Sequence, residues 1–456
     1  MLRRSISFLA AVLICSAAST NITEHAFATS GTFNVLSLSV NGLPAILNPF
    51  GASGAEKDLN TKYMGVALSQ YDYGVVNVQK LHFSQDFSYH TTLYHHDNHP
   101  FRTEFSGGVL FGSGLNTLSK YSWIDFSRIR WEWCSNDSGY DCMGFTFMRV
   151  RIDEGVYIDM INLHADAGIE PGDEEARRWN IRQVSEYISA NSVGNAVIVF
   201  GNTNSRYTRA KDDLDLFISQ NNLADAWVQA NKGKVPAVGT DAIVCPNESP
   251  SNISCEVVDK VFYRGSRVID LNSTGFSYDT ARFLSPEGKM LTDHHPVRVD
   301  FEYALRNGLR QSDLYGGPHG TWFNDLPLVH PGSNPSLIAL CGANRLDGLI
   351  LKLDSGLVTH GGSGGDCYML LLGPEEYITS VKLCLGQKDE HTRIFFARAT
   401  TNKGRPVQAG TLTYNCTIVK APSGYGVVGT YGQAGDEIDQ LGFIYAQQCV
   451  GKPCST

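Results

Sequence analysis

The chain has 456 residues, of which 42% are hydrophobic and 18% charged, and its formal net charge is −9. This length suggests two or three domains, and the composition is that of an ordinary globular protein with material for more than one core. Affinity for a nucleic-acid backbone rests on clustered Lys and Arg, so an acidic chain is not expected to bind nucleic acid.

The N-terminus is typical of a signal peptide, which we predict over residues 1–28. Arg3 and Arg4 form its positive region, Phe8 to Cys15 its apolar core, and small residues follow. The apolar stretch is too short to span a bilayer. We therefore expect a secreted, extracellular protein.

The cysteines agree with export. The chain has 11, and removal of Cys15 with the signal peptide leaves an even number. Their spacings do not suit a compact zinc site, so disulfides are the better interpretation. The remaining cysteines form two close pairs and a group in the last third of the chain: Cys134, Cys142; Cys245, Cys255; Cys341, Cys367, Cys384, Cys416, Cys449 and Cys454. Glycosylation sequons add to this argument, at Asn21, Asn136, Asn247, Asn252, Asn272 and Asn415.

Residues 30–303 alternate between short strands and a few helices, which predicts a layered α/β sandwich. Strands are expected at 35–40, 75–78, 155–162 and 196–200. A helix is expected over 174–190, with Trp179, Ile181, Val184 and Ile188 on one face. Polar residues follow several of these strands, and open sheets build active sites at such strand ends.

Histidine, aspartate and asparagine together at several strand ends favour catalysis over a purely structural role. The ordered segments resemble the endonuclease/exonuclease/phosphatase superfamily, which includes DNase I-like nucleases and neutral sphingomyelinases. The sphingomyelinase-like branch is the most similar, because Gly-Leu-Pro follows the first strand. The segments are Leu38 to Pro44, Ser113 to Ser119, Asn162 to His164, Gly201 to Asn204 and Asp293 to Pro296.

This resemblance implies a four-layer α/β sandwich and Mg²⁺-assisted hydrolysis of a phosphodiester. His294 matches the family's terminal catalytic histidine, with Asp293 as its neighbour. His164 matches the mid-chain histidine, and Asn204 matches the asparagine that contacts phosphate. Asp259 matches an aspartate beside the site.

Three positions depart from the family pattern: Ser39 stands for Asn, Lys80 for a metal-binding Glu, and Asn202 for Asp. Mg²⁺ prefers hard oxygen ligands, usually with one or two carboxylates. Loss of a general base alone costs about 10²–10⁴ in rate. We therefore expect a degenerate site that holds no metal, with Mg²⁺ as cofactor only if the site is active.

Alternatives remain open at this point. The Glu position could fall on Gln85, and a substitute carboxylate could come from Asp72, Asp86 or Asp166. An incorrect gene model around residues 80–85 is another explanation of the missing Glu. An active, lectin-targeted Mg²⁺ phosphodiesterase is the main alternative function. A repurposed site around His164, Asn204 and His294 is a third.

Residues 304–312 are short and polar and are predicted to be a linker. After it, residues 313–446 show Gly-rich turns between short alternating strands, which is typical of an all-β domain. Strands are expected at 349–353, 378–381, 411–414 and 441–445. Residues 447–456 form a Cys-containing tail.

The order of the C-terminal motifs resembles jacalin-like lectins. They are Tyr315 to Gly320, Phe323 to Asp325, Arg345 to Leu349, Gly361 to Gly365, Glu376 to Val381, Gly424 to Gly432 and Gly435 to Gly442. The resemblance implies a β-prism of three small sheets that binds sugars. The family's Gly-x-x-x-Asp loop maps onto Gly435 to Asp439, with Asp436 and Glu437 between them, and the N-terminal glycine onto Gly316 or Gly317.

A carboxylate such as that of Asp439 can accept two sugar hydroxyls, and backbone N–H groups at glycine turns can approach a ligand closely. The sequence thus predicts a secreted glycan-binding protein fused to a phosphodiesterase-like domain with a degenerate site. Glycans are the expected partners of residues 313–446, and a phospholipid or membrane surface is a further candidate partner.

Overall fold

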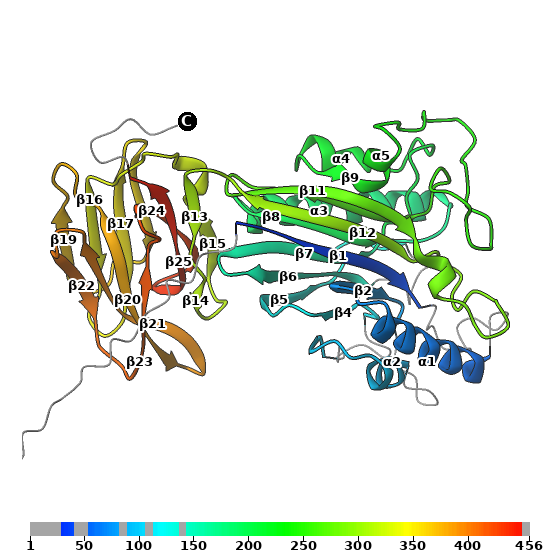
Figure 1. Ribbon diagram of the computed structural model, residues 1–456, viewed down its shortest axis with the longest axis horizontal. Helices are drawn as coiled ribbons and strands as arrows, with labels where there is room; N and C mark the ends of the chain where they lie inside the picture. The colour runs from blue at the N-terminus through cyan, green and yellow to red at the C-terminus, as the bar shows by residue number, and fades with distance from the viewer. Residues whose placement is uncertain (1–28, 41–52, 82–88, 105–112, 136–142, 449–456) are drawn as a thin grey trace, which may run out of the picture.

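The structure is a computed structural model that describes residues 29–40, 53–81, 89–104, 113–135 and 143–448. The N-terminal strands and the helices form one half of the molecule, and the C-terminal strands form the other, beside it (Figure 1). The predicted signal peptide lies outside the described residues, as do Cys449 and Cys454 of the predicted tail.

Two six-stranded sheets form the N-terminal domain. The first has the order β11-β12-β1-β2-β4-β3 and the second β5-β6-β7-β8-β10-β9. The first comprises β11 (Ile269–Tyr278), β12 (Val297–Leu305), β1 (Ser30–Ser39), β2 (Val75–Gln79), β4 (Asn116–Ser119) and β3 (Phe101–Arg102). The second comprises β5 (Trp123–Ile129), β6 (Gly144–Asp153), β7 (Val156–His164), β8 (Ala196–Asn202), β10 (Asp259–Arg264) and β9 (Ala224–Asp225).

Alternation along the strands decides which layer each side chain joins, because successive residues of a strand face opposite sides. Val35 and Val75 pack between the two sheets, whereas Leu36 and Val76 pack outward under the helices. The helices are α1 (Gly54–Gln70), α2 (Tyr89–His96), α3 (Pro171–Asn191), α4 (Asp215–Ser219) and α5 (Ala226–Ala230), with a 3₁₀ turn η1 (Asp279–Arg282). The predicted four-layer α/β sandwich is confirmed.

One detail of the helix prediction is wrong. Ile181, Val184 and Ile188 are fully buried on α3, but Trp179 is 46% exposed. Trp179 and Ile181 are two positions apart, which is about 200° around a helix of 3.6 residues per turn, so the two point in opposite directions.

Three small antiparallel sheets form the C-terminal domain, as the resemblance implied. Two of them join through a single register pair, Ile378 with Val427. The first holds β13 (Leu309–Gln311), β14 (Tyr315–Gly316), β15 (Thr321–Asn324), β24 (Tyr425–Ala434) and β25 (Ile438–Gln447). The second holds β20 (Ile378–Lys388), β21 (His391–Thr401), β22 (Pro406–Gly410) and β23 (Asn415–Lys420). The third holds β16 (Leu337–Cys341), β17 (Gly348–Leu353), β18 (Gly356–Gly361) and β19 (Cys367–Leu371), and η2 (Leu326–Leu328) is a short 3₁₀ turn.

Two boundary predictions need correction. Residues 411–414 connect β22 to β23 and are not a strand, because Gly410 turns the backbone into the left-handed region at φ 86°. The linker predicted over 304–312 shrinks to a turn: β12 runs to Leu305, and β13 begins at Leu309. Leu309 is buried, and its strand pairs with β25, so this segment belongs to the C-terminal core.

A buried arginine joins the two domains. Arg149 on β6 is ion-paired with Asp125 and with Asp159, the latter at 2.8 Å. Its guanidinium carbon lies 3.5 Å from the ring centroid of Trp322, in the C-terminal domain. Gln433 and Gln440 of the same domain donate hydrogen bonds to Asp125. These charges are buried, and some of their partners lie across the domain boundary. Separating the domains would therefore leave buried polar groups without their hydrogen-bond partners.

The disulfide interpretation is confirmed for three pairs, Cys245–Cys255, Cys341–Cys367 and Cys384–Cys416. None of the helices in the described part of the chain is both long and apolar enough to cross a membrane.

Candidate functional site

Three predicted site positions lie in register at one edge of the second sheet. His164 on β7 is opposite Asn202 on β8, and Asn202 is opposite Asp259 on β10. All three side chains are buried. The strands end here, so the polar residues that follow them gather at the same edge, as the sequence predicts.

Buried amides tie this edge to the first sheet. Gln79, at the end of β2, donates a 2.8 Å hydrogen bond to the Asn162 side chain. Asn77 donates to the backbone oxygen of Phe200 at 3.1 Å. These amides are almost inaccessible to solvent, so their partners must come from within the protein. Gln79 therefore links the two sheets and leaves the next residue, Lys80, to face the site.

Lys80 contacts the predicted catalytic histidine. Its Nζ lies 3.3 Å from Nε2 of His294, and the other ring nitrogen of His294, Nδ1, lies 2.7 Å from a carboxylate oxygen of Asp259. An ammonium group has no acceptor, so Lys80 can only donate to Nε2, and the imidazole tautomer that accepts this bond carries its proton on Nδ1, toward Asp259.

A second lysine lies close by. Lys57 on α1 is buried, and burial lowers its pKa; the charge of Lys80 lowers it further, whereas the charge of Asp293 opposes the shift. Asp293 itself is 55% exposed, and its carboxylate lies 4.0 Å from Nε2 of His294. The site thus combines two lysines with the two aspartates Asp259 and Asp293.

The remaining predicted positions near these strand ends are Asn202, Asn204 and Ser39. The Asn202 side-chain oxygen accepts from the backbone N–H of Asn204, and Asn204 donates to the Ala165 oxygen, both at 2.8 Å. Asn204 adopts a left-handed backbone at φ 50°. Among the described residues, Oγ of Ser39, Nδ2 of Asn202 and Oδ1 of Asp259 are buried polar atoms without a hydrogen-bond partner.

The candidate substitute carboxylates lie in different places. Asp72 precedes β2, at the opposite end of the strand from Lys80, and it pairs with Lys120. The prediction that Asp72 could replace the missing ligand is therefore wrong. Asp166 is buried, and its carboxylate accepts from the backbone N–H of Ser135. Gln85 and Asp86 lie outside the described residues.

Mg²⁺ does not fit the residues present. Within the described ranges, no group of three or more His, Cys, Asp or Glu side chains is arranged to hold a metal ion. Lys80 brings an ammonium group to the end of β2, where the family has a metal-binding Glu, and Asn202 offers an amide in place of a carboxylate. A cation that needs oxygen ligands would meet a positive charge there.

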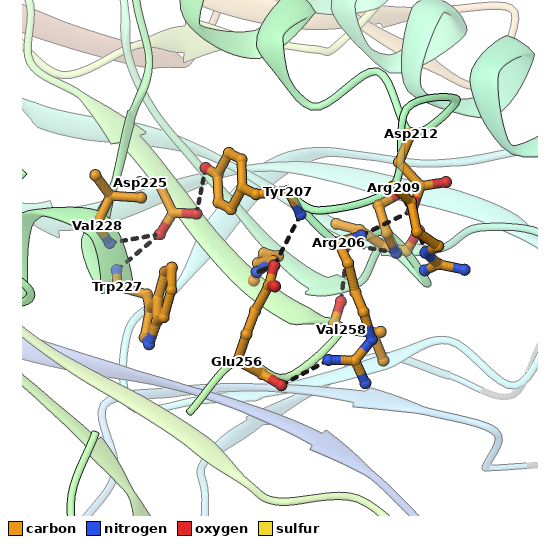
Figure 2. Close-up of polar contacts among 12 residues, drawn as sticks. Arg206, Tyr207, Arg209, Asp212, Asp225, Trp227, Val228, Glu256 and Val258 are labelled. Carbon is orange, nitrogen blue, oxygen red and sulfur yellow. Dashed lines mark hydrogen bonds and ion pairs between the residues drawn. The ribbon is translucent and has the colours of Figure 1, made fainter. Parts of the chain in front are cut away.

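A buried network behind Asp259 holds its strand in place. Lys260 is ion-paired with Glu256 at 2.7 Å, and its ammonium lies 4.9 Å from the ring centroid of Tyr207. Figure 2 shows the Tyr207 hydroxyl donating to Asp225 and the Tyr207 backbone N–H donating to Glu256. Apart from Oε2 of Glu256, which has no hydrogen-bond partner among the described residues, these groups pair with one another, so we assign them to positioning β10 rather than to ligand binding.

The predicted sugar loop forms a second candidate site, in the C-terminal domain. Gly317 donates a 3.0 Å hydrogen bond to the backbone oxygen of Asp439. A Cβ on Gly316 would come within 2.1 Å of that same oxygen, so this close approach requires glycine. Gly435 and Asp436 are exposed, whereas Glu437 and Asp439 are buried.

Basic side chains occupy the two buried carboxylates of this loop. Arg393 lies 2.6 Å from Oδ1 of Asp439, and Glu437 pairs with Arg345, with Lys388 and with Arg393. Burial raises the pKa of Asp439 to about 6, although the charge of Arg393 opposes the shift. Burial acts in the same direction on Glu437, but hydrogen bonds from Arg345 and Lys388 lower its pKa below the usual value.

Oδ2 of Asp439 is the oxygen turned away from Arg393. It lies beside Gly320, where a Cβ would approach it to 2.5 Å, and 4.0 Å from the Cβ position of Gly435. The two glycines keep side chains away from this oxygen.

Both domains match known families. Residues 55–231 match the model described as Endonuclease/Exonuclease/phosphatase family 2, and residues 312–444 match the jacalin-like lectin domain. The chain joins an endonuclease/exonuclease/phosphatase domain to a jacalin-like lectin domain. The lectin match begins directly after β13, so it leaves out the strand that the structure pairs with β25.

Among curated proteins, the chain is 33% identical over 285 residues to proteins named sphingomyelinase from Mycobacterium tuberculosis and Mycobacterium bovis. The match covers 61% of this chain and 54% of each relative, so the chain spans about half the length of these relatives. It is also 30% identical over 169 residues to secreted RxLR effector protein 19 of Plasmopara viticola, which covers 33% of this chain and 92% of that protein.

Solved structures similar to each domain include sphingomyelinase C from Streptomyces griseocarneus, at 15% identity and a TM-score of 0.41, covering 59% of this chain and 99% of that one. Malaysian banana lectin is 19% identical, with a TM-score of 0.28, and the match covers 31% of this chain and 100% of that one.

Sequence reasoning missed four basic residues: Lys57 near Lys80, and Arg345, Lys388 and Arg393 around the sugar loop. Lys57 lies in an otherwise ordinary helix, and the three others come from a turn and a hairpin far from residues 435–439 in the chain. Arg345 begins one of the lectin motifs, but no local pattern shows that it, or any of the other three, lies at a site, because their contacts arise only when distant segments pack together.

Proposed function

We propose that the protein is a secreted glycan-binding protein whose lectin domain carries its activity, and that its phosphodiesterase-fold domain has lost Mg²⁺-dependent hydrolysis. The observation that carries the second part is the 3.3 Å contact between Lys80 and His294, which brings an ammonium group to the catalytic histidine. Asn202, in place of the family's aspartate, supports the same conclusion.

For the lectin domain, support comes from the loop Gly435 to Asp439 lying against Gly316 and Gly317, the arrangement in which glycine N–H groups and one carboxylate can meet sugar hydroxyls. Oδ2 of Asp439 is the acceptor we assign to a sugar hydroxyl. Export is supported by the signal-peptide pattern, the disulfides and a relative whose name calls it secreted.

The test of the lectin assignment is glycan-array binding followed by calorimetry with the best sugar. We expect Asp439→Asn to weaken binding at least about tenfold, which is about 1.4 kcal/mol. Asp354→Asn, at an exposed turn of the same domain, is the matched control and should bind as the native chain does. Equal binding by native protein and Asp439→Asn would remove this loop as the site.

The second candidate function is an active metal-dependent phosphodiesterase that the lectin brings to glycosylated membranes. It is favoured by the identity to proteins named sphingomyelinase and by the intact His294–Asp259 pair. Mg²⁺ calorimetry on the full chain, with hydrolysis of a generic phosphodiester, separates the two: metal binding with turnover supports this candidate, and absence of both supports the first.

A further inference from the structure

The end of β2 presents hydrogen-bond donors where a metal site presents oxygens. We propose that Lys80, Lys57, Ser39, Asn202 and His294, called here the Lys80 site, bind a phosphate group directly, without a divalent cation. The proposed function assigns no ligand to this domain, so this inference goes beyond it.

The backbone of Lys80 is the first observation. It adopts φ 59°, in the left-handed region that side chains with a Cβ seldom occupy. Strain of this kind collects at functional sites, where the surroundings hold it. Here it coincides with an Nζ placed 3.3 Å from His294, within the site rather than in open solvent.

The charge balance is the second observation. The two lysines, Lys80 and Lys57, balance the two aspartates, Asp259 and Asp293, so the site is near neutral with no ion bound. Glu at position 80 and Asp at position 202 would make it more negative by two charges and by one charge respectively. A phosphate would need a metal to approach that more negative site, whereas here the two lysines offset the repulsion from Asp259 and Asp293.

Unpartnered buried donors are the third observation. Nδ2 of Asn202 and Oγ of Ser39 lack a hydrogen-bond partner among the described residues, and both residues are almost completely buried. Native proteins seldom leave such atoms unpaired. A phosphate oxygen accepts from an amide N–H, a hydroxyl and an ammonium alike, so the donors at the ends of β1, β2 and β8 are of the kinds that bind such an anion.

The first experiment is calorimetry of the full chain with inorganic phosphate in the presence of EDTA. We expect binding that Lys80→Gln weakens at least tenfold. Lys62→Gln is the matched control, because Lys62 is exposed on the same helix as Lys57, and it should leave the affinity unchanged. The thermal midpoint of each variant reports whether it is folded.

Asn202→Asp is a second variant that keeps the side chain's size. It replaces an amide donor by a carboxylate, so we expect it to weaken phosphate binding at least tenfold as well. If the native chain binds no phosphate in EDTA, or binds it only with Mg²⁺ present, the proposal is wrong. Equal affinity of the native chain, Lys80→Gln and Asn202→Asp would also overturn it.

A second arm identifies the source of the phosphate group. Flotation with phosphatidylcholine vesicles in EDTA tests a lipid headgroup. Binding that Lys80→Gln abolishes there supports a lipid ligand, whereas binding of inorganic phosphate alone supports a soluble one. Mg²⁺ binding with turnover would refute both this inference and the proposed loss of hydrolysis. A chain that binds neither Mg²⁺ nor phosphate would refute this inference alone.

Discussion

The two candidate sites differ in how a positive charge reaches them. At the end of β2 a cation, Lys80, follows Gln79 at the position where we predicted a metal-binding carboxylate. In the sugar loop the carboxylate of Asp439 is kept, and Arg393 is added to it from a neighbouring hairpin at 2.6 Å. We propose that a substitution of the first kind removes metal chemistry, whereas an addition of the second kind changes the protonation and accessibility of a ligand that remains.

This difference shows why retained residues are a poor measure of retained chemistry. The phosphodiesterase-fold domain keeps His164, Asn204, Asp259, Asp293 and His294, yet Nζ of Lys80 lies 3.3 Å from Nε2 of His294. The lectin loop keeps its aspartate, yet one of its two oxygens is already occupied. In both places a neighbouring basic residue, Lys80 at His294 or Arg393 at Asp439, changes the environment of the retained group.

The largest effect is expected at Arg149, a buried arginine that is paired with two carboxylates at the boundary between the domains. Arg149→Leu leaves Asp125 and Asp159 buried without their partner, and we expect a loss of about 3–5 kcal/mol in the free energy of unfolding, measured by urea denaturation. Arg151→Leu, on the same strand, is the control: its pair with Asp313 is partly exposed and should cost about 1 kcal/mol or less. Equal losses in the two variants would show that burial does not set the value of these pairs.

The next effect concerns the replaced ligand. The double variant Lys80→Glu, Asn202→Asp restores two carboxylates, and we expect it to gain Mg²⁺ affinity by about 10–100-fold over the native chain in calorimetry. Asn202→Asp alone should gain less, because the Lys80 ammonium remains. If the double variant binds Mg²⁺ no better than the native chain, the loss of metal binding lies elsewhere in the site, and Lys80 is not its cause.

The smallest effect concerns the kept ligand. Because the pKa of Asp439 is raised to about 6, chiefly by burial, its carboxylate becomes protonated as pH falls below that value. If ionised Asp439 accepts a sugar hydroxyl, sugar affinity should fall about tenfold between pH 7 and pH 5, measured by calorimetry. Asp439→Asn should show a flat profile over this range, and a flat profile in the native chain would contradict the assignment.

The same pKa shift affects folding stability in the opposite direction, because protonation of Asp439 favours the folded state. The folded chain holds a proton on Asp439 up to about pH 6, while the unfolded chain releases it near pH 4, so between these values the folded state binds more protons. The contribution of Asp439 to stability is therefore fully present below about pH 4 and is lost as pH rises through 6. The difference between native and Asp439→Asn thermal midpoints across this range reports it.

Much of the fold could be predicted from the sequence, because alternation and helical periodicity record burial directly. Val35 and Leu36 alternate between layers as expected, and Ile181, Val184 and Ile188 form the buried face of α3. The errors arose where local pattern and tertiary pairing disagree. The polar segment after β12 looked like a free linker because nothing local shows that Leu309 adds a strand to β25.

The candidate sites were predictable to the extent that they rest on motifs. Lys80 and Asn202 were visible as departures from an ordered family pattern. The Lys80–His294 contact was not, since it joins residues 214 positions apart and depends on the left-handed backbone at Lys80. Arg393 was invisible for the same reason: a hairpin brings it to a loop whose own sequence looks complete.

The short turn between β12 and β13, together with the Arg149 network, makes the two domains a rigid pair rather than two modules on a tether. For a flexible tether, the second binding event gains an effective concentration that linker length sets. Here the relative orientation of the two domains sets the effective concentration instead. When a glycan holds the lectin domain, the Lys80 site points in one direction only. A surface that presents its second ligand along that direction is bound with avidity, and a surface that presents it elsewhere gains nothing from the fusion.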